Sequence, residues 1–243
     1  MSKKENNSVA VIVPVYNEEK VVGWVLKGLL KVCQSIPADI IVVNDGSTDR
    51  TLREIKDFLP DIKIINYKKN RGKGYALRMG SLLAYKQKYE SIIWIDGDGQ
   101  LQPKDIIKLN KSLDAKTDYV IHHRIIDFQV LPLSKIGRGT VRLLFNYLFG
   151  TKISDHLSGL KAFKAKILPS ILWRSNDYTV EVEFLARAAC NKLKHRTVAS
   201  RCDPKLYHGI GWQQGLKIYY WIFWCFMNRR SFSQPIEEID KKS

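Results

Sequence analysis

The sequence lacks the features that would place it among disulfide-bonded, zinc-binding, secreted or membrane-spanning proteins. Its 243 residues include only four cysteines, which are scattered without the paired spacing of a zinc site or a redox motif. We therefore expect free thiols in a reducing compartment. No stretch holds the ~18 apolar residues that a spanning helix needs, and residues 1–8 lack the apolar core of a signal peptide. These absences favour a cytoplasmic protein.

Acidic residues are also few compared with basic ones. Asp and Glu number 24 against 40 Lys and Arg, which gives a formal net charge of +16 and a pI of about 9.6. Such an excess predicts an anionic partner, which could be nucleic acid, an anionic membrane surface or a phosphorylated substrate, although part of it serves solubility. Because no nucleic-acid recognition motif is present, we rank a non-enzymatic nucleic-acid-binding protein last and expect no nucleic-acid partner.

The chain does contain a regular alternation of apolar runs and helix-forming segments. Apolar runs predict strands at residues 9–15, 40–43, 62–66 and 92–95, with helices between them at residues 21–33, 51–59 and 75–85. Strands that alternate with helices form a parallel α/β sheet. After residue 100 the pattern weakens, with helices predicted at 103–113, 134–149 and 179–190, short strands at 119–123 and 197–200, and an irregular segment at 124–133.

Two carboxylates one residue apart follow the apolar run at residues 92–95. Asp96 and Asp98 lie where a strand gives way to a loop, which is where ligands collect in α/β sheets. Carboxylates this close repel each other unless a cation lies between them. Hard oxygen ligands suit Mg²⁺ or Mn²⁺, which would also hold the phosphates of a substrate. Gln100 offers a third oxygen, while the plain alternative is a solvated Asp-Gly turn.

The ends of the other three predicted strands also carry groups that could bind a nucleotide. Tyr16 could stack on a base and Glu18 could bind ribose, although Asn17 and Glu18 equally fit a helix N-cap and a first-turn acid. Asp45 could accept hydrogen bonds from a base or close an Asx turn. The glycine-rich turn around Lys73 lets the backbone approach a phosphate, but it lacks the Walker ending and the dinucleotide fingerprint. Their joint placement at successive strand ends favours one ligand site.

Four stretches carry a resemblance to a known family. They read PVYNE at residues 14–18, NDGSTD at 44–49, NRGKG at 70–74 and DGDGQ at 96–100, and together they resemble the signature of family 2 glycosyltransferases with the GT-A fold. The later stretch DHLSGLKAF at residues 155–163 resembles the branch that loads sugars onto polyprenyl phosphates, which includes dolichol-phosphate mannosyltransferase. The resemblance covers about residues 9–201. It implies a Rossmann-like α/β domain with a central, mostly parallel sheet.

The resemblance also implies roles for individual residues. Nucleotide-sugar binding would fall to Pro14, Tyr16, Glu18, Val43, Asp45, Lys73, Asp96, Gly97, Asp98, Arg124, Arg201 and Lys205, of which Asp98, Arg124 and Arg201 would be catalytic. Asp96, Asp98 and Gln100 would bind the Mg²⁺ or Mn²⁺ ion. The chain departs from the family pattern at Asn44, at His122 and His123, and in residues 202–209, where Lys205 stands in for a Gly-x-Ser-Lys ending. The two histidines either narrow the site or face solvent.

The implied reaction is transfer of a hexose, with inversion, from a nucleotide-diphosphate sugar to a polyprenyl phosphate such as dolichyl or undecaprenyl phosphate. A phosphate acceptor is already an anionic nucleophile and needs no protein base. The alternative is transfer to a saccharide hydroxyl during surface polysaccharide or lipopolysaccharide assembly, which requires a carboxylate base. No acidic pair of the kind used by those branches follows Gln100. Glu181 and Glu183 are candidate bases, and they fit equally well as first-turn acids of a helix.

The last part of the chain is aromatic and basic. Residues 216–227 hold six Trp, Tyr and Phe side chains, and Arg229 and Arg230 follow them. Because Trp and Tyr prefer the membrane interface, we expect a peripheral enzyme at the cytoplasmic face of a membrane, held by an anionic surface or a membrane partner. A helix packed on the core is the alternative. The predicted organisation is a flexible N-terminus at 1–8, a glycosyltransferase domain at 9–205, an aromatic helical extension at 206–232 and a disordered tail at 233–243.

Overall fold

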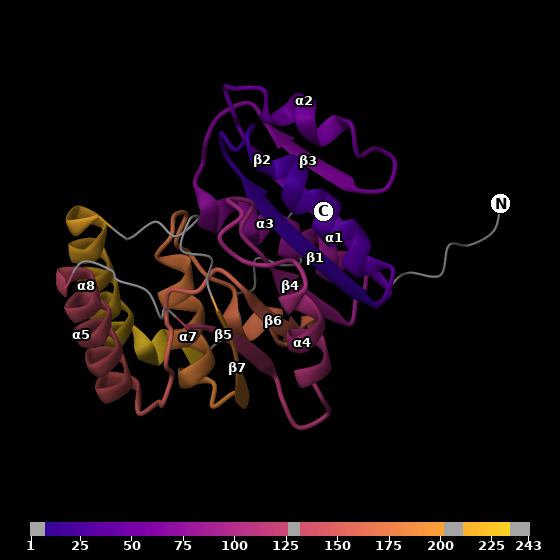
Figure 1. Ribbon diagram of the computed structural model, residues 1–243. Helices are drawn as coiled ribbons and strands as arrows, with labels where there is room; N and C mark the ends of the chain where they lie inside the picture. The colour runs from indigo at the N-terminus through magenta and orange to yellow at the C-terminus, as the bar shows by residue number, and fades with distance from the viewer. Residues whose placement is uncertain (1–7, 126–131, 202–210, 234–243) are drawn as a thin grey trace.

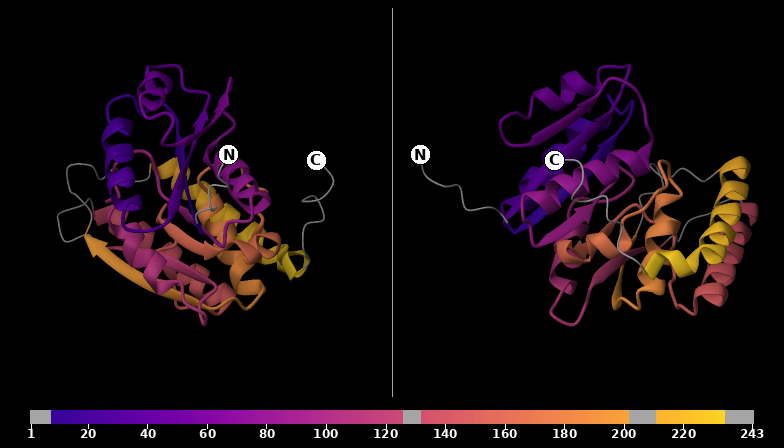
Figure 2. Two further views of the ribbon diagram at one scale, coloured as in Figure 1. Left: turned by 90° about the vertical axis from the view of Figure 1, so that its right-hand side faces the viewer. Right: turned by 180° about the vertical axis from the view of Figure 1, so that it is seen from behind.

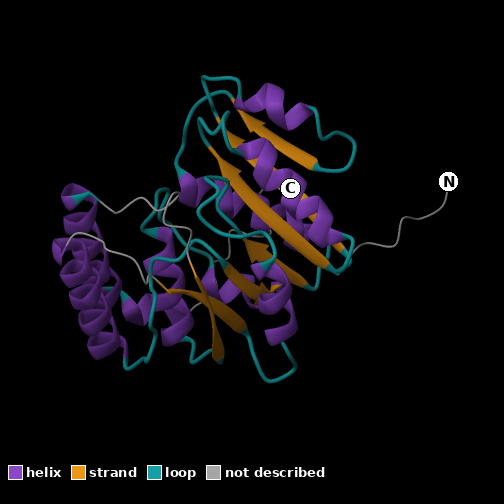
Figure 3. Ribbon diagram, in the orientation of Figure 1, coloured by secondary structure: helices purple, strands orange, loops and turns teal. Residues whose placement is uncertain are grey.

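A seven-stranded sheet forms the centre of the described part of the chain. The computed structural model describes residues 8–125, 132–201 and 211–233, so Lys205 and all but one residue of each predicted terminal segment, 1–8 and 233–243, lie outside the described residues. The strand order is β3-β2-β1-β4-β6-β5-β7 (Figures 1 and 3). The strands are β1 (Val9–Val15), β2 (Ala38–Asp45), β3 (Lys63–Tyr67), β4 (Ser91–Trp94), β5 (Tyr119–Ile125), β6 (Lys161–Lys164) and β7 (His195–Arg201).

The first four strands form the parallel half of the sheet, as the alternating pattern predicted. β1 pairs in parallel with β2 and β4, and β2 pairs in parallel with β3. Every residue of β1 and β4 is buried. Strands covered on both faces read as continuous apolar runs, which is why these two were recognisable from sequence.

Helices cover both faces of the sheet. They are α1 (Val22–Cys33), α2 (Thr51–Lys56), α3 (Lys73–Lys86), α4 (Asp105–Ser112), α5 (Pro132–Phe149), α6 (Leu168–Ile171), α7 (Val180–Cys190) and α8 (Trp212–Met227), with short 3-10 turns at Ala165–Ile167 and Arg229–Ser233. Apolar residues of α1, α2 and α4 pack into the core on one face, and those of α3, α5, α6, α7 and α8 into the core on the other. The result is a three-layer α/β domain, and its elements agree with the GT-A expectation.

The second half of the sheet departs from simple alternation. β6 runs antiparallel to both of its neighbours, β4 and β5, while β7 pairs in parallel with β5. The sequence pattern did not predict β6, because this strand has only four residues and a lysine at each end. Its insertion places the loop that precedes it, residues 154–160, next to the end of β4.

The aromatic segment forms α8 and divides into two faces. Ile218, Ile222 and Cys225 are buried in the core, and Trp221 and Trp224 stack on each other with ring centroids 4.9 Å apart while packing against that core. These two tryptophans are half-buried and pack against the core, which agrees with the alternative of a helix packed on the core for this side of α8. Other large apolar side chains of α8 are exposed. Within the three described ranges, no helix combines the length and hydropathy needed to cross a bilayer.

Candidate active site

Most of the predicted nucleotide-binding residues converge on one cleft at the carboxyl ends of β1, β2 and β4. A cavity of about 250 Å³ is lined by Pro14, Val15, Tyr16, Glu18, Asp45, Asn70, Lys73, Ala76, Asp96, Gly97 and Asp98. Val43 does not line it, because its side chain is fully buried in the core beneath α3. A larger cavity of about 1110 Å³ lies at the amino ends of β1 and β4, whereas the cleft lies at their carboxyl ends. None of the predicted residues lines this larger cavity.

Hydrogen bonds tie the turns after β1 and β2 together. The side chain of Asn17 accepts a hydrogen bond from the backbone of Thr48 at 2.8 Å, and the backbone of Asn17 donates to the Ser47 hydroxyl at 3.0 Å. The backbone of Glu18 donates to the Thr51 hydroxyl at 2.7 Å. The sequence suggested that Asn17 caps α1, but the structure shows that it does not. Asn17 has a positive φ of 56°, and the helix begins only at Val22.

Asp45 anchors the glycine-rich turn that precedes α3. Its two carboxylate oxygens accept hydrogen bonds from the backbone N–H groups of Arg71, at 2.9 Å, and Gly72, at 2.6 Å. Gly72 has a φ of 97°, and a Cβ there would collide with the backbone carbonyl of Asn176. Only glycine fits this position. The turn places Lys73 at the start of α3, where it points into the cleft.

The floor of the cleft concentrates negative charge. Burial, together with the nearby carboxylates of Asp98, Asp49 and Asp96, raises the pKa of Glu18 to about 7. Carboxylates that disfavour one another's ionisation in this way form a suitable environment for a hard cation. Among the described residues no three His, Cys, Asp or Glu side chains form a complete metal site, so oxygens of a bound substrate would have to complete one.

One ammonium group balances part of this charge. Lys73 Nζ lies 2.7 Å from a carboxylate oxygen of Asp96 and 2.6 Å from Oε1 of Glu181, on α7. Burial would lower the pKa of Lys73, but the two carboxylates together raise it above its ordinary value. Glu181, which the sequence offered as a catalytic base, is therefore held in an ion pair. Glu183 is likewise bound to Arg187, at 2.8 Å.

The loop at residues 154–160 packs directly against Asp96. A Cβ added to Gly159 would lie 1.9 Å from Oδ2 of Asp96. The backbone of this loop is therefore in van der Waals contact with the carboxylate of Asp96, a candidate metal ligand, and leaves no room for a side chain. Lys161 follows the loop and is fully buried; burial lowers its pKa to about 8, and its Nζ donates to the carbonyl of Ser158. We did not single out Lys161 from the sequence, although a lysine inside the apolar run at residues 160–163 is a signal for a buried charge.

A second, basic cavity adjoins this loop. It measures about 400 Å³ and is lined by His123, Arg124, Ile125, Arg138, Gly139, Val141, Arg142, Ser154, Asp155, His156 and Leu157. Arg124 donates from Nε and Nη2 to the two carboxylate oxygens of Asp155, at 2.8 and 3.0 Å. These donors keep the pKa of Asp155 well below its ordinary value, although burial alone would raise it. Arg201 ends β7, opposite Ile125 in the sheet register, and so lies on the strand beside Arg124.

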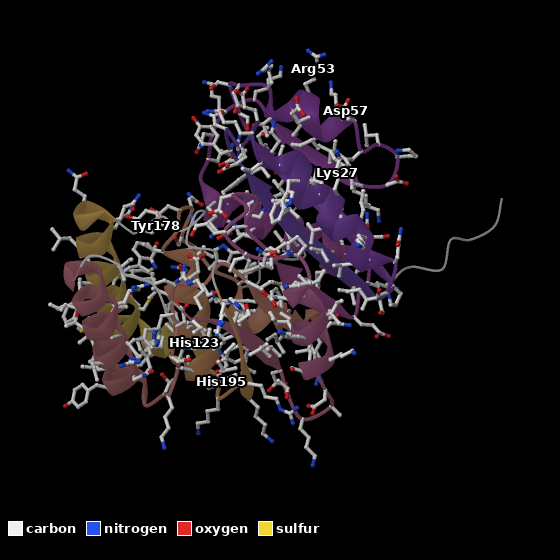
Figure 4. The ribbon with its side chains drawn as sticks, viewed as in Figure 1. Lys27, Arg53, Asp57, His123, Tyr178 and His195 are labelled. Atoms are coloured by element: carbon white, nitrogen blue, oxygen red, sulfur yellow. The ribbon has the colours of Figure 1, made fainter. Side chains whose placement is uncertain are left out.

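The two histidines of β5 have different environments. His122 is fully buried, and its ring nitrogens contact the hydroxyls of Ser158, at 3.1 Å, and Ser200, at 2.6 Å. Burial lowers the pKa of His122 to about 4, which keeps the ring neutral. It neither narrows the site nor faces solvent; it connects β7 to the loop beside Asp96. His123 instead lines the basic cavity (Figure 4), and its Nδ1 has no hydrogen-bond partner among the described residues.

Comparison with known proteins agrees with this arrangement. The profile described as Glycosyl transferase family 2 matches residues 10–168. An uncharacterized protein of Methanocaldococcus jannaschii is 34% identical, over 79% of this chain and 80% of its own length. The UDP-N-acetylglucosamine–dolichyl-phosphate N-acetylglucosaminyltransferase of Methanococcus voltae is 30% identical, over 87% of this chain and 93% of its own.

Solved structures support the fold independently. The crystal structure of glucosyl-3-phosphoglycerate synthase from Mycobacterium tuberculosis, in complex with Mn²⁺, uridine diphosphate and glucosyl-3-phosphoglycerate, superposes with a TM-score of 0.71. The superposition covers 92% of this chain and 81% of the synthase at 17% sequence identity, a level at which the likeness concerns the fold alone. From the profile match and its relatives, this chain belongs to glycosyl transferase family 2.

Proposed function

We propose that the protein transfers a hexose from a nucleoside-diphosphate sugar to a polyprenyl phosphate. The observation that carries the proposal is the pair of cavities joined by the loop at residues 154–160. One cavity is lined by carboxylates suited to a metal-bound diphosphate, and the other by Arg124, Arg138 and Arg142. In this proposal the two cavities take the two phosphate-bearing substrates. The dolichyl-phosphate acceptor in the name of the Methanococcus voltae relative supports the same substrate class.

The acidic cleft is assigned to the donor. Tyr16 is 44% exposed at its rim and offers a ring on which a base could stack, while Pro14 and Glu18 line the wall beside it. Asp96 and Asp98 would hold Mg²⁺ or Mn²⁺ together with the donor diphosphate, since magnesium is commonly bound through one or two carboxylates plus substrate phosphates. The metal ion would stabilise the negative charge that develops on the departing diphosphate. Gln100 shares this loop, and its backbone N–H orients Asp98 through a 3.0 Å hydrogen bond.

The basic cavity is assigned to the acceptor phosphate. Charged guanidinium groups bind phosphate through paired hydrogen bonds, and three arginines line this cavity. His123 and His156 line it too, and each has a ring nitrogen with no hydrogen-bond partner in the described ranges. An oxygen of the lipid phosphate would attack the anomeric carbon, the bond from that carbon to the diphosphate would break, and the configuration would invert. The arginines neutralise charge on the acceptor, and Arg201 adds to the positive field from β7.

Transfer to a saccharide hydroxyl is the alternative acceptor chemistry. It would need a free carboxylate near the reacting oxygen. The two candidates from the sequence, Glu181 and Glu183, are held by Lys73 and Arg187. This pairing favours an acceptor that arrives already ionised. A lipid acceptor and a nucleotide-sugar donor also favour peripheral action at the cytoplasmic face of a membrane.

The proposal is tested by supplying radiolabelled nucleotide sugars with polyprenyl phosphate and measuring label in the organic phase. Label in the organic phase supports a lipid acceptor, whereas label retained on an added oligosaccharide supports the alternative. Asp98→Ala should abolish transfer and leave the circular dichroism spectrum unchanged, because the side chain contributes no core contact. A matched control is Asp57→Ala, in the turn after α2 and far from the cleft (Figure 4).

Metal dependence is tested in the same assay. Activity should vanish in excess chelator and return when Mn²⁺ or Mg²⁺ is added back, with the stronger ion identified by titration. Full activity in excess chelator would remove the metal from the mechanism.

A further inference from the structure

Among the residues that the structure describes, no element covers an apolar face that runs along α5 and α8. On α5 the exposed side chains are Ile136, Leu143 and Tyr147, and on α8 they are Leu216, Tyr220, Phe223 and Met227. Each is between 58% and 86% exposed. Among the described residues eleven large apolar side chains are exposed, and these seven account for most of them. Exposure concentrated in this way marks an interaction surface, whereas single exposed apolar residues are ordinary.

The seven side chains form one surface because the two helices lie side by side. Tyr219 of α8 contacts Thr140 of α5 through their hydroxyls, and Phe226 meets Phe149 edge-to-face at 6.1 Å. Figures 1 and 2 show both helices together at one side of the molecule. The exposed residues recur at spacings of seven and four on α5 and of four, three and four on α8, so those of each helix share its outward face.

Basic side chains predominate around this face, although Lys217 is paired with Asp177 in the loop before α7. Helices α5 and α8 and the turn Arg229–Ser233 contain no Asp or Glu. They carry Lys135, Arg138, Arg142, Lys217, Arg229 and Arg230. A second copy of this chain would bring these basic groups against one another, and Asp177 is already engaged by Lys217. An anionic surface complements them, and Tyr and Phe beside Arg and Lys are the composition of a helix lying in a lipid interface.

The apolar face is also continuous with the proposed acceptor site. Arg138 and Arg142 belong to α5 and line the basic cavity, while Leu143 and Tyr147 project from the outward side of the same helix. A lipid whose phosphate sits in that cavity must keep its hydrocarbon chain out of water. The outward side of α5 is an apolar surface on the helix that carries two of the cavity's arginines, and it could meet the bilayer holding that chain.

We propose that α5 and α8 form a docking surface that lies in the interface of an anionic lipid bilayer. Leu143, Tyr147, Tyr220, Phe223 and Met227 enter the headgroup region, and Arg229 and Arg230, just after the end of α8, contact lipid phosphates. The proposal deepens the proposed function and rests on it for the position of the acceptor. It assigns the contact to the outward stripes of two helices, with Trp221 and Trp224 on the inward side.

The experiment measures co-sedimentation of the full chain with vesicles of phosphatidylcholine alone and of phosphatidylcholine mixed with phosphatidylglycerol. The test variant carries Leu143→Gln, Tyr220→Gln, Phe223→Gln and Met227→Gln. We expect its binding to the mixed vesicles to fall by at least about ten-fold, because four apolar side chains no longer enter the interface. The matched control carries Trp24→Gln and Leu59→Gln, two exposed apolar residues on the other side of the sheet, and should sediment like the wild type.

A charge variant separates the two contributions. Arg229→Gln with Arg230→Gln should weaken binding to the mixed vesicles at low salt, and this difference should shrink as salt screens the charges. The apolar variant should remain weak at every salt concentration. Circular dichroism melts of both variants should match the wild type, because all substituted side chains are exposed.

The outcomes distinguish docking from the proposed reaction. If the apolar variant sediments as well as the wild type, the docking surface is wrong. If size-exclusion chromatography shows a wild-type dimer that the apolar variant dissolves, a second copy covers the face and the proposal is overturned. If the variant loses vesicle binding yet the wild type transfers sugar to no polyprenyl phosphate, docking stands and the proposed function fails. Loss of transfer to a long-chain acceptor in vesicles, with transfer to a short water-soluble one retained, supports both.

Discussion

At the scale of single residues, the contact between Gly159 and Asp96 makes the sharpest prediction. Gly159→Ala would place a methyl group where the Asp96 carboxylate now lies, so either the loop or the carboxylate must move. Since displacement of a reacting group by about 1 Å can cost about 100-fold in rate, we expect a loss of that order in kcat. Steady-state kinetics with the lipid acceptor would measure it.

A second glycine provides the control for this substitution. Gly215, in α8, has open space where a Cβ would be added, so Gly215→Ala should retain activity and leave stability equal or slightly raised. Equal kinetics for both alanine variants would mean that Asp96 tolerates displacement and does not hold the donor.

The Arg124–Asp155 pair predicts a separation of stability from activity. Both side chains are largely buried, so Arg124→Ala leaves an uncompensated carboxylate and should destabilise the fold by about 3–5 kcal/mol. The double variant Arg124→Met with Asp155→Leu removes both charges and should recover much of that loss in urea unfolding. Transfer should stay severely reduced in both variants, because neither restores a phosphate ligand.

The control for this pair lies at the surface. Arg50 and Glu19 form an exposed ion pair, and breaking it should cost less than about 1 kcal/mol. Wild-type turnover in the double variant would show that Arg124 serves structure alone.

The sequence predicted the position of some site residues well, but it did not predict the contacts that their side chains make. Asp96, Asp98 and Lys73 were identified because strand ends and glycines are visible in a sequence, and all three line the cleft. The partners of Asp45 and His122 were not visible, because they come from positions distant in the chain. Ion pairs that depend on tertiary proximity leave no local pattern.

At the scale of elements, Gly80 sets how closely α3 packs on the sheet. A Cβ at this position would lie 2.5 Å from Ile12 Cγ2 and 3.2 Å from Val43 Cγ2. Gly80→Ala should therefore push α3 away from β1 and β2 and destabilise the protein by about 1–3 kcal/mol, measured by urea unfolding. Gly23→Ala, in α1, meets no atom within 4 Å and should not destabilise. A neutral Gly80→Ala would mean that α3 can shift without cost.

The elements that were predicted well share a simple physical origin. β1 and the helices α5 and α7 carry strong apolar patterns over many residues, and their predicted positions agree closely with the structure. The 3-10 turn Ala165–Ile167, α6 and β6 were not predicted, because each has three or four residues and takes its conformation from neighbours. Short elements lack the periodicity on which sequence reasoning depends.

At the scale of the whole molecule, two buried histidines predict weakening of the fold in mild acid. Burial lowers the pKa of His122 and of His156 from 6.5 to about 4. Between these values the unfolded chain binds protons that the folded protein excludes. Stability is therefore fully present above pH 6.5 and is lost as the pH falls towards 4, by up to about 3 kcal/mol for each histidine.

Urea unfolding at a series of pH values, from neutral down to about 4, would measure this loss of stability. His122→Gln should reduce the dependence of the unfolding free energy on pH between 6.5 and about 4. It should also lower stability at neutral pH, because the contacts of His122 with two serines are altered. Adding His156→Gln should flatten the curve further. Parallel curves for the wild type and both variants would place the acid sensitivity in other groups.

Net charge was the least specific of the whole-molecule signals. The excess of basic residues predicted an anionic partner but did not distinguish nucleic acid, membrane or phosphorylated substrate. The structure places several of the arginines together around one cavity and on α5 and the turn after α8. Composition reports how many charges a chain has, and only the fold determines which of them act together.

Strand β6 joins the two halves of the sheet through four residue pairs with β4. The residues that line the acidic cleft all precede residue 99, and those that line the basic cavity all follow residue 122. Recombination between two related genes at a point within codons 99–122 would replace one cavity and keep the other. The hybrid would have to retain the Lys73–Glu181 ion pair and Gly159, which contacts Asp96. Recombination at this boundary offers a lineage, or a protein engineer, a direct route to new pairings of sugar and acceptor.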